Sequence, residues 1–125
     1  MGVKTENFDI AIKFVEDMPE SVITGTMIEF GSKVMERTPV DTGFARNSWT
    51  LTKNKNYTDD QGLGEESILD FSLGESLYLN NGANYINNLE DGTSTQAPQG
   101  MVSVTIPEIP YILQDQIRDY MRANR

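Results

Sequence analysis

Apolar residues recur at helical spacing in the first third of the chain. Residues 6 to 17 predict a short amphipathic helix on this basis, with the apolar positions Phe8, Ile12 and Val15. Residues 19 to 37 predict a longer helix, because Pro19 suits a first helical position. Its core-facing stripe is Ile23, Met27, Phe30 and Val34. Gly25 and Gly31 interrupt this helix and indicate either close approach of another backbone or simple tolerance.

In residues 44 to 53 the side-chain pattern changes from helical spacing to alternation between two faces, which predicts a strand. One face would carry Phe44, Arg46, Ser48 and Thr50, and the other Ala45, Asn47, Trp49 and Leu51. We expect Trp49 to pack beneath the helix. Arg46 would lie on the opposite face, where it could reach a partner or Asp41, or be simply solvated. Residues 75 to 81 predict the returning strand, which a turn signal at Asn81-Gly82 closes.

Between these strands, residues 54 to 74 form a polar stretch that is long for a hairpin loop. We expect it to project as a docking loop that becomes ordered mainly when a neighbour binds. The far end would be anchored by Ile68, Leu69 and Phe71, and the acidic residues of the candidate docking surface are Asp59, Asp60, Glu65 and Glu66. Its glycine and acidic spacings fit neither a phosphate loop nor a calcium loop.

The C-terminal third predicts two more helices. Residues 83 to 89 predict a short one with a buried edge at Tyr85, Ile86 and Leu89, followed by an exposed loop over residues 93 to 100. Helical spacing then continues to the end of the chain, and from periodicity alone this last helix begins at Pro107. The pattern as a whole predicts one α+β domain over residues 1 to 125. In it a small antiparallel hairpin-based sheet packs under the long N-terminal helix and the C-terminal helix.

The long helix and the first strand meet in a six-residue corner that starts at Thr38. Pro39 lacks a backbone N–H and ends the helix, while Asp41 and Thr42 can accept hydrogen bonds from nearby backbone N–H groups. Gly43 can adopt a positive φ without steric cost. We therefore expect a tight, self-hydrogen-bonded corner.

This corner and two later segments together resemble the tail-completion, or neck, proteins of tailed bacteriophages. The segments are Thr38-Pro39-Val40-Asp41-Thr42-Gly43, then Tyr85 to Ser94 with Leu89-Glu90-Asp91-Gly92-Thr93-Ser94, then Ala97-Pro98-Gln99-Gly100-Met101. The resemblance covers about residues 20 to 122. It implies that the first two helices form one arm with a bend at Pro19, and that the last helix opens near Pro98 or Met101. For the start of that helix we follow the resemblance.

The resemblance also implies a structural role without catalysis. Such proteins form a ring, here expected to be hexameric, that joins the head-closure proteins to the tail and leaves a channel for DNA. The chain would thus be a virion protein made in the host cytoplasm. A ring needs one patch to meet a different patch on the next copy. Our candidates are the corner with Arg46 on one side and the region of Leu89, Glu90, Gly92 and Thr93 on the other.

The composition further limits the kinds of functional site that the chain can form. The chain has no cysteine and no histidine, so thiolate sites and the usual neutral-pH base are missing, and we expect no metal, no cofactor and no enzymatic activity. The formal net charge of −9 disfavours binding to phosphate backbones; it suits a channel wall, or merely keeps the chain in solution. No stretch has the length of a membrane span.

The sequence gives little support for catalysis by individual residues. Glu90 and Asp91 are adjacent and would not face one another on a helix, and Ser48 or Thr42 would lack an activating base. Glu90 instead fits a local cap beside Gly92 or an ion pair across a subunit contact. Two alternatives to the neck ring stay open: a tail-terminator ring, and a monomeric acidic binding module such as a DNA-mimic inhibitor.

Overall fold

The computed structural model describes residues 8–11, 18–39, 44–53, 62–83, 86 and 100–124. Within these ranges the fold is α+β, as the sequence predicts: helices pack against an antiparallel sheet. The elements in chain order are β1 (Phe8–Ala11), α1 (Glu20–Glu36), α2 (Phe44–Asn47), β2 (Trp49–Thr52), η1 (Glu65–Ile68), β3 (Tyr78–Asn81), α4 (Val102–Thr105), η2 (Ile106–Glu108) and α5 (Ile109–Ala123).

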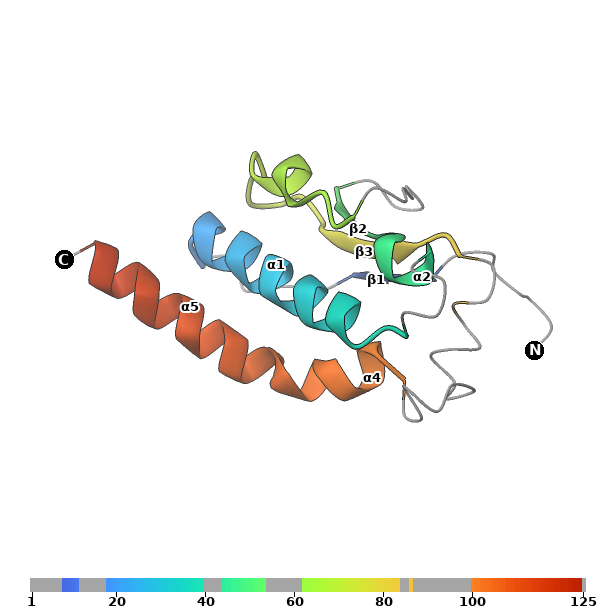
Figure 1. Ribbon diagram of the computed structural model, residues 1–125. Coiled ribbons are helices and arrows are strands. Elements are labelled where there is room, and N and C mark those ends of the chain that lie inside the picture. The colour runs from blue at the N-terminus through green and yellow to red at the C-terminus, as the bar shows by residue number, and fades with distance from the viewer. Residues whose placement is uncertain are drawn as a thin grey trace.

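The molecule is built in layers around α1. The sheet and η1 lie on one side of this helix, and α5 runs antiparallel to it on the other side (Figure 1). The predicted sheet-and-helix arrangement is therefore confirmed, but α5 packs chiefly on α1 and not on the sheet itself. The stripe of Ile23, Met27, Phe30 and Val34 is fully buried, as the helical spacing predicts.

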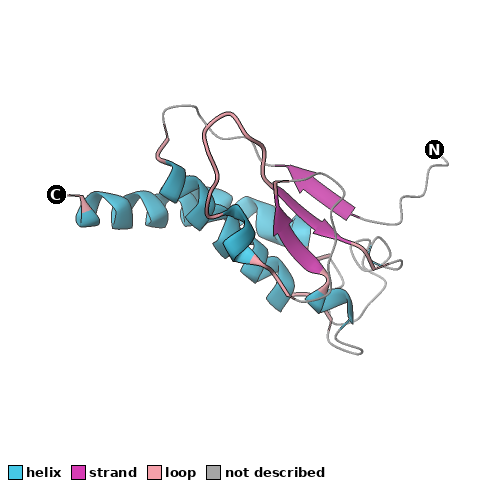
Figure 2. Cartoon of the chain, turned by 90° about the horizontal axis from the view of Figure 1, so that it is seen from above, coloured by secondary structure: helices cyan, strands magenta, loops and turns pink. Residues whose placement is uncertain are grey.

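The sheet has the strand order β1-β3-β2, and both pairs are antiparallel. Figure 2 shows the three strands side by side. The predicted pairing of β2 with β3 is confirmed, with Trp49 opposite Asn81 and Leu51 opposite Leu79. The strand predicted from Glu75 begins only at Tyr78. Trp49 is completely buried, which confirms the expectation that it packs beneath the helix.

The prediction of a helix over residues 6 to 17 is wrong for Phe8–Ala11, which form β1. These residues pair with β3 in register from Phe8 opposite Asn81 to Ala11 opposite Tyr78. An isolated helix of such length is marginal in water, and the open edge of β3 offers backbone partners that the local pattern does not reveal. Residues 12–17 lie outside the described part of the chain. Pro19 is described and precedes the first residue of α1, but the predicted arm of two helices joined at Pro19 is wrong where Phe8–Ala11 form a strand.

The strand predicted over residues 44 to 53 begins later than expected. Phe44–Asn47 form the short helix α2, and only Trp49–Thr52 form the strand. The two faces do not divide into a buried and a solvated one, since Ser48, Thr50 and Thr52 are buried together with Trp49 and Leu51. An alternating pattern cannot reveal this, because small hydroxyl side chains are accepted on either kind of face.

The described part of the polar stretch, residues 62–74, does not project from the body. The backbone N–H of Leu51 donates to the carbonyl of Leu63 at 2.9 Å, and the hydroxyl of Ser67 donates to the carbonyl of Leu51 at 2.7 Å. The outer edge of β2 is therefore covered. Ile68 and Phe71 are buried, as expected of an anchor, but Leu69 is 65% exposed and the prediction that it anchors the segment is wrong.

The helical path at the C-terminus begins at Val102, which confirms a start near Met101 and not at Pro107. It continues through η2 into α5. Pro107 and Pro110 fall within the first residues of η2 and α5, where a missing N–H costs little. Periodicity alone misplaced the start because these two prolines give the stronger local signal.

At two glycines of α1, side chains from other parts of the chain occupy the space that a Cβ would need. A Cβ on Gly25 would overlap the amide of Gln116 on α5, and a Cβ on Gly31 would lie 3.2 Å from a methyl carbon of Leu63. The sequence left open whether these glycines mark a close approach or mere tolerance. Both mark close approach, of side chains and not of another backbone.

Replacing Phe30 with Ala is expected to lower the free energy of unfolding by about 3–5 kcal/mol, because this side chain is completely buried between α1 and the sheet. The matched control is Tyr111→Ala, since Tyr111 is an aromatic residue that is 69% exposed, and its change should stay within about 0.5 kcal/mol. Urea denaturation of both variants measures this. Equal losses would contradict the placement of the core.

Candidate functional site

The corner after α1 is held by one buried hydroxyl. The Thr38 hydroxyl accepts a hydrogen bond from the indole N–H of Trp49 at 2.7 Å and donates one to the carbonyl of Val34 at 2.8 Å. Thr38 is 1% exposed and Trp49 is completely buried. A buried indole N–H needs an acceptor, so this contact fixes where the end of α1 meets the start of β2.

Arg46 supports the same corner from α2. One guanidinium nitrogen, Nη2, donates to the carbonyl of Glu36 at 2.8 Å, and Nε donates to the carbonyl of Thr38 at 3.3 Å. Carbonyls at a helix C-terminus have no partner within the helix and carry partial negative charge, so a guanidinium there is favourable. The placement of Arg46 on a strand face is wrong, because it lies in α2, whereas its role in a subunit contact stays a prediction. Its side chain closes the end of α1 within the same chain.

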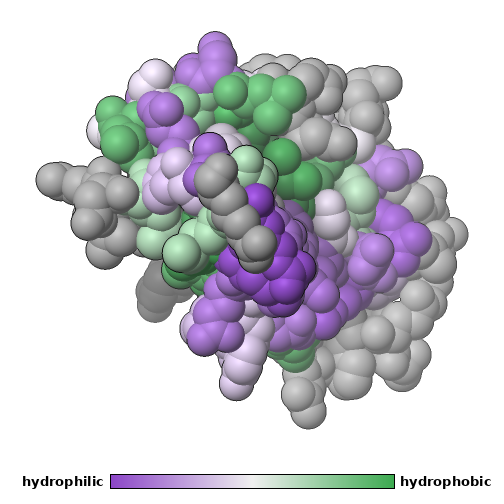
Figure 3. Space-filling model, turned by 90° about the vertical axis from the view of Figure 1, so that its left-hand side faces the viewer, coloured by the Kyte–Doolittle hydropathy of each residue, from purple (hydrophilic) through white to green (hydrophobic). Residues whose placement is uncertain are grey.

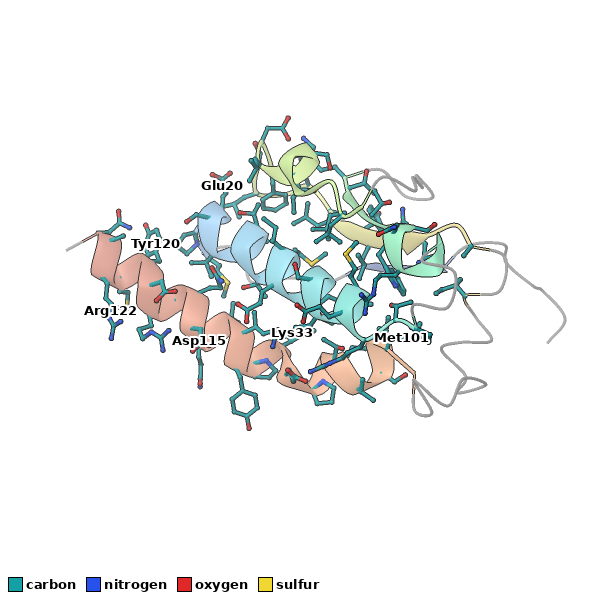
Figure 4. The ribbon with its side chains drawn as sticks, viewed as in Figure 1. Glu20, Lys33, Met101, Asp115, Tyr120 and Arg122 are labelled. Atoms are coloured by element: carbon teal, nitrogen blue, oxygen red, sulfur yellow. The ribbon has the colours of Figure 1, made fainter. Side chains whose placement is uncertain are left out.

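A second polar cluster joins the end of α1 to the C-terminal elements. Arg37 contacts the Glu108 carboxylate at 2.6 Å and donates to the hydroxyl of Thr105 at 2.8 Å, while Lys33 lies 3.6 Å from Glu108. Figure 4 shows Lys33 where α1 faces this segment. The hydrogen bond from Arg37 lowers the pKa of Glu108 below its usual value, and the charges of Arg37 and Lys33 act in the same direction. The carboxylate therefore stays ionised to a lower pH than that of an unpaired glutamate.

A third cluster pins the turn after η1. The Lys53 ammonium lies 3.0 Å from Asp70 and 3.4 Å from Glu75. The hydrogen bond with Asp70 raises the pKa of Lys53, and the same bond lowers the pKa of Asp70. Glu75 also accepts from the backbone N–H of Ser72 at 2.7 Å, and Glu20 at the start of α1 accepts from that of Leu73 at 3.1 Å. The turn is therefore held to both α1 and β2.

The structure brings together only part of the predicted site. Thr38, Pro39 and Arg46 meet at the corner. Glu65 and Glu66 lie in η1. The other candidates fall outside the described residues: Asp41, Thr42, Gly43, Asp59, Asp60, Leu89, Glu90, Gly92 and Thr93. A subunit contact through the Leu89 to Thr95 region thus stays a prediction.

Sequence reasoning missed Arg37 and Glu108, although both stand at recognisable places. Arg37 follows the last turn of α1, where a basic residue is favourable, and Glu108 falls in the first turn of the last helical segment, where an acidic one is favourable. Nothing in the sequence indicates that these two helix ends face each other.

The described residues hold no group of three or more acidic side chains placed to bind a metal ion. Among the helices of the described ranges, none has the length and apolar character needed to cross a bilayer. Comparisons of the chain with protein-family models, with curated proteins and with solved structures found no match. The interpretation of the site therefore rests on its geometry and on the sequence motifs.

Replacing Thr38 with Val should lower the free energy of unfolding by about 1–3 kcal/mol, because it removes the acceptor for a buried indole N–H. Thr38→Ser keeps the hydroxyl and is the matched control, which should lose clearly less. Denaturant unfolding followed by tryptophan fluorescence measures both. A Val variant as stable as the Ser variant would show that the hydroxyl does not hold the corner.

The Glu108 cluster predicts a pH dependence of stability. Because the folded-state pKa of Glu108 lies below its ordinary value of 4.5, its contribution is complete above pH 4.5 and is lost as the pH falls through the folded-state value. The melting temperature of Glu108→Gln should therefore lie below that of the wild type at pH 7, and the gap should narrow toward pH 3. A gap that stays constant with pH would contradict this assignment.

Proposed function

We propose that this protein is a structural component of a tailed-phage virion and forms a ring at the joint between head and tail. In this role the chain joins the head-closure proteins to the tail and surrounds the path of the DNA. Its work is to bind copies of itself and its neighbours, and no substrate is transformed.

The observation that carries the proposal is the position of the first motif. Thr38 and Pro39 open the Thr-Pro-Val-Asp-Thr-Gly sequence, and they lie where α1 ends and the path to the sheet begins. Side chains from α2 and β2, those of Arg46 and Trp49, converge on them. The described start of the motif is thus held in place before any neighbour docks, and a joint that is already ordered loses little conformational entropy on docking.

Charge supports the same role. The chain carries nineteen acidic and ten basic residues. Four of the basic side chains, Lys33, Arg37, Arg46 and Lys53, make contacts within the chain and are not free to neutralise phosphates. A wall with a negative surplus repels DNA that passes close to it and does not retain it.

Removing the gene from the phage should leave DNA-filled heads and separate tails, because the ring that joins them would be missing. Electron microscopy of lysates detects this, and mass spectrometry of purified wild-type particles should find the polypeptide at a few copies per particle. Supply of the gene in trans is the control and should restore joined particles.

Joined, infectious particles without the polypeptide would refute the proposal. They would favour the acidic binding module, which acts inside the cell and is not packaged. A tail terminator predicts a different defect: the deletion phage should make tails of irregular length, and in the wild type the polypeptide should lie at the upper end of tails that have not yet joined a head.

A further inference from the structure

Two exposed apolar patches lie on different parts of the surface. The first, the α5 groove, is a hollow of about 540 Å³ on one side of that helix, lined by Gln114, Ile117, Arg118, Met121 and Arg122. Met121 is 65% exposed. The second, the leucine turn, comprises residues 69–75, in which Leu69 and Leu73 are 65% and 47% exposed. Exposed apolar patches on otherwise polar proteins commonly mark interaction surfaces.

The charged side chains that line the α5 groove and those that surround the leucine turn differ in sign. Both charged residues that line the α5 groove are arginines. Arg118 also contacts Asp115 at 3.2 Å and Asp119 at 3.4 Å, whereas Arg122 makes no ion pair with the described residues. Around the leucine turn stand the carboxylates of Glu20, Asp70 and Glu75, and of the described cations only Lys53 contacts them.

The patches also look in different directions. The segment that carries the leucine turn lies on the opposite side of α1 from α5 (Figure 1). Arg122 and Asp115 point away from α1, on the outer side of α5 (Figure 4). On the end of the molecule shown in Figure 3, hydrophobic side chains lie at the top, at the height of η1 in Figure 1, above a band of hydrophilic ones. One molecule therefore cannot satisfy both patches by packing them together.

We infer that the α5 groove of one copy receives the leucine turn of the next copy. Leu69 and Leu73 would enter the groove against Ile117 and Met121, and Arg122 would face the carboxylates of Asp70 and Glu75. The contact joins unlike patches, so it is heterologous, and repetition of it generates a ring or a filament. The inference rests on the proposed ring, for which it names the contact between neighbours.

The energetics suit assembly in many copies. The turn is held in place by Lys53 and Glu20 before docking, so little conformational entropy is lost when it binds. A typical stable interface buries about 800 Å² on each partner, which is more than a groove on one helix offers, so a single contact is expected to be weak. In a closed ring each copy makes two such contacts, and closure makes the whole ring stable.

The test uses single-cysteine variants, since the natural chain has no cysteine. Leu73→Cys and Met121→Cys are mixed, with one of them carrying a mass tag, and then oxidised mildly. We expect a covalent dimer of the two different variants, with about tenfold more product than a mixture of Leu73→Cys with Tyr111→Cys. Tyr111 is an exposed residue of the same helix that does not line the groove, which makes its variant the matched control.

A yield equal to that of the Tyr111→Cys control overturns the inference, as does preferential pairing of Leu73→Cys with itself. Leu69→Cys provides a second variant on the same turn if Leu73→Cys melts at a lower temperature than the wild type. The two proposals fail separately. Virions that contain the polypeptide without this cross-link exclude the contact alone, whereas cross-linked copies absent from virions exclude the place in the particle alone.

Discussion

The rest of the structure depends on the hydrogen bond between the indole of Trp49 and the hydroxyl of Thr38. An indole N–H that is shielded from water must find an acceptor or lose the free energy of a hydrogen bond. The same hydroxyl donates to the carbonyl of Val34, so the contact also closes the last turn of α1. The contact therefore sets the angle at which the chain leaves α1 and the position of β2 relative to that helix.

With its C-terminal end held in this way, α1 packs against two layers, the sheet on one side and α5 on the other. The stripe through Phe30 packs on the sheet, and the side that carries Gly25 accepts Gln116 of α5. Gln116 in turn donates to the Glu29 carboxylate at 3.3 Å. Of the described α5 side chains only Ile112 is fully buried, whereas Tyr111, Tyr120 and Met121 are exposed among the described residues. These exposed apolar side chains make α5 a candidate for contacts between copies of the chain.

The distribution of charge follows the same division. The cations near the helix ends and just after β2 make contacts inside the molecule: Arg46 caps α1, Arg37 and Lys33 hold Glu108, and Lys53 holds the turn. Among the described carboxylates, those of Asp70 and Asp119 stay largely exposed, at 78% and 62%. This arrangement is consistent with the proposed ring, in which an arginine without an ion pair among the described residues would face carboxylates of the next copy.

The sequence by itself determined the elements whose pattern is long or strongly punctuated. The α+β class, the stripe of α1, the helix end at Thr38 and Pro39, the burial of Trp49 and the pairing of β2 with β3 all follow from spacing and from proline. Such features are encoded by neighbours along the chain, so local physical chemistry is sufficient to find them.

Only the tertiary structure decided the rest. Phe8–Ala11 became a strand because β3 had an edge to pair with, and Arg46 turned inward because the last carbonyls of α1 lay within its reach. The groove on α5 and the leucine turn are candidate contact surfaces only because of where the fold places them, on opposite sides of α1. The free energy that decides each of these cases comes from residues far apart in the sequence, and no local pattern contains it.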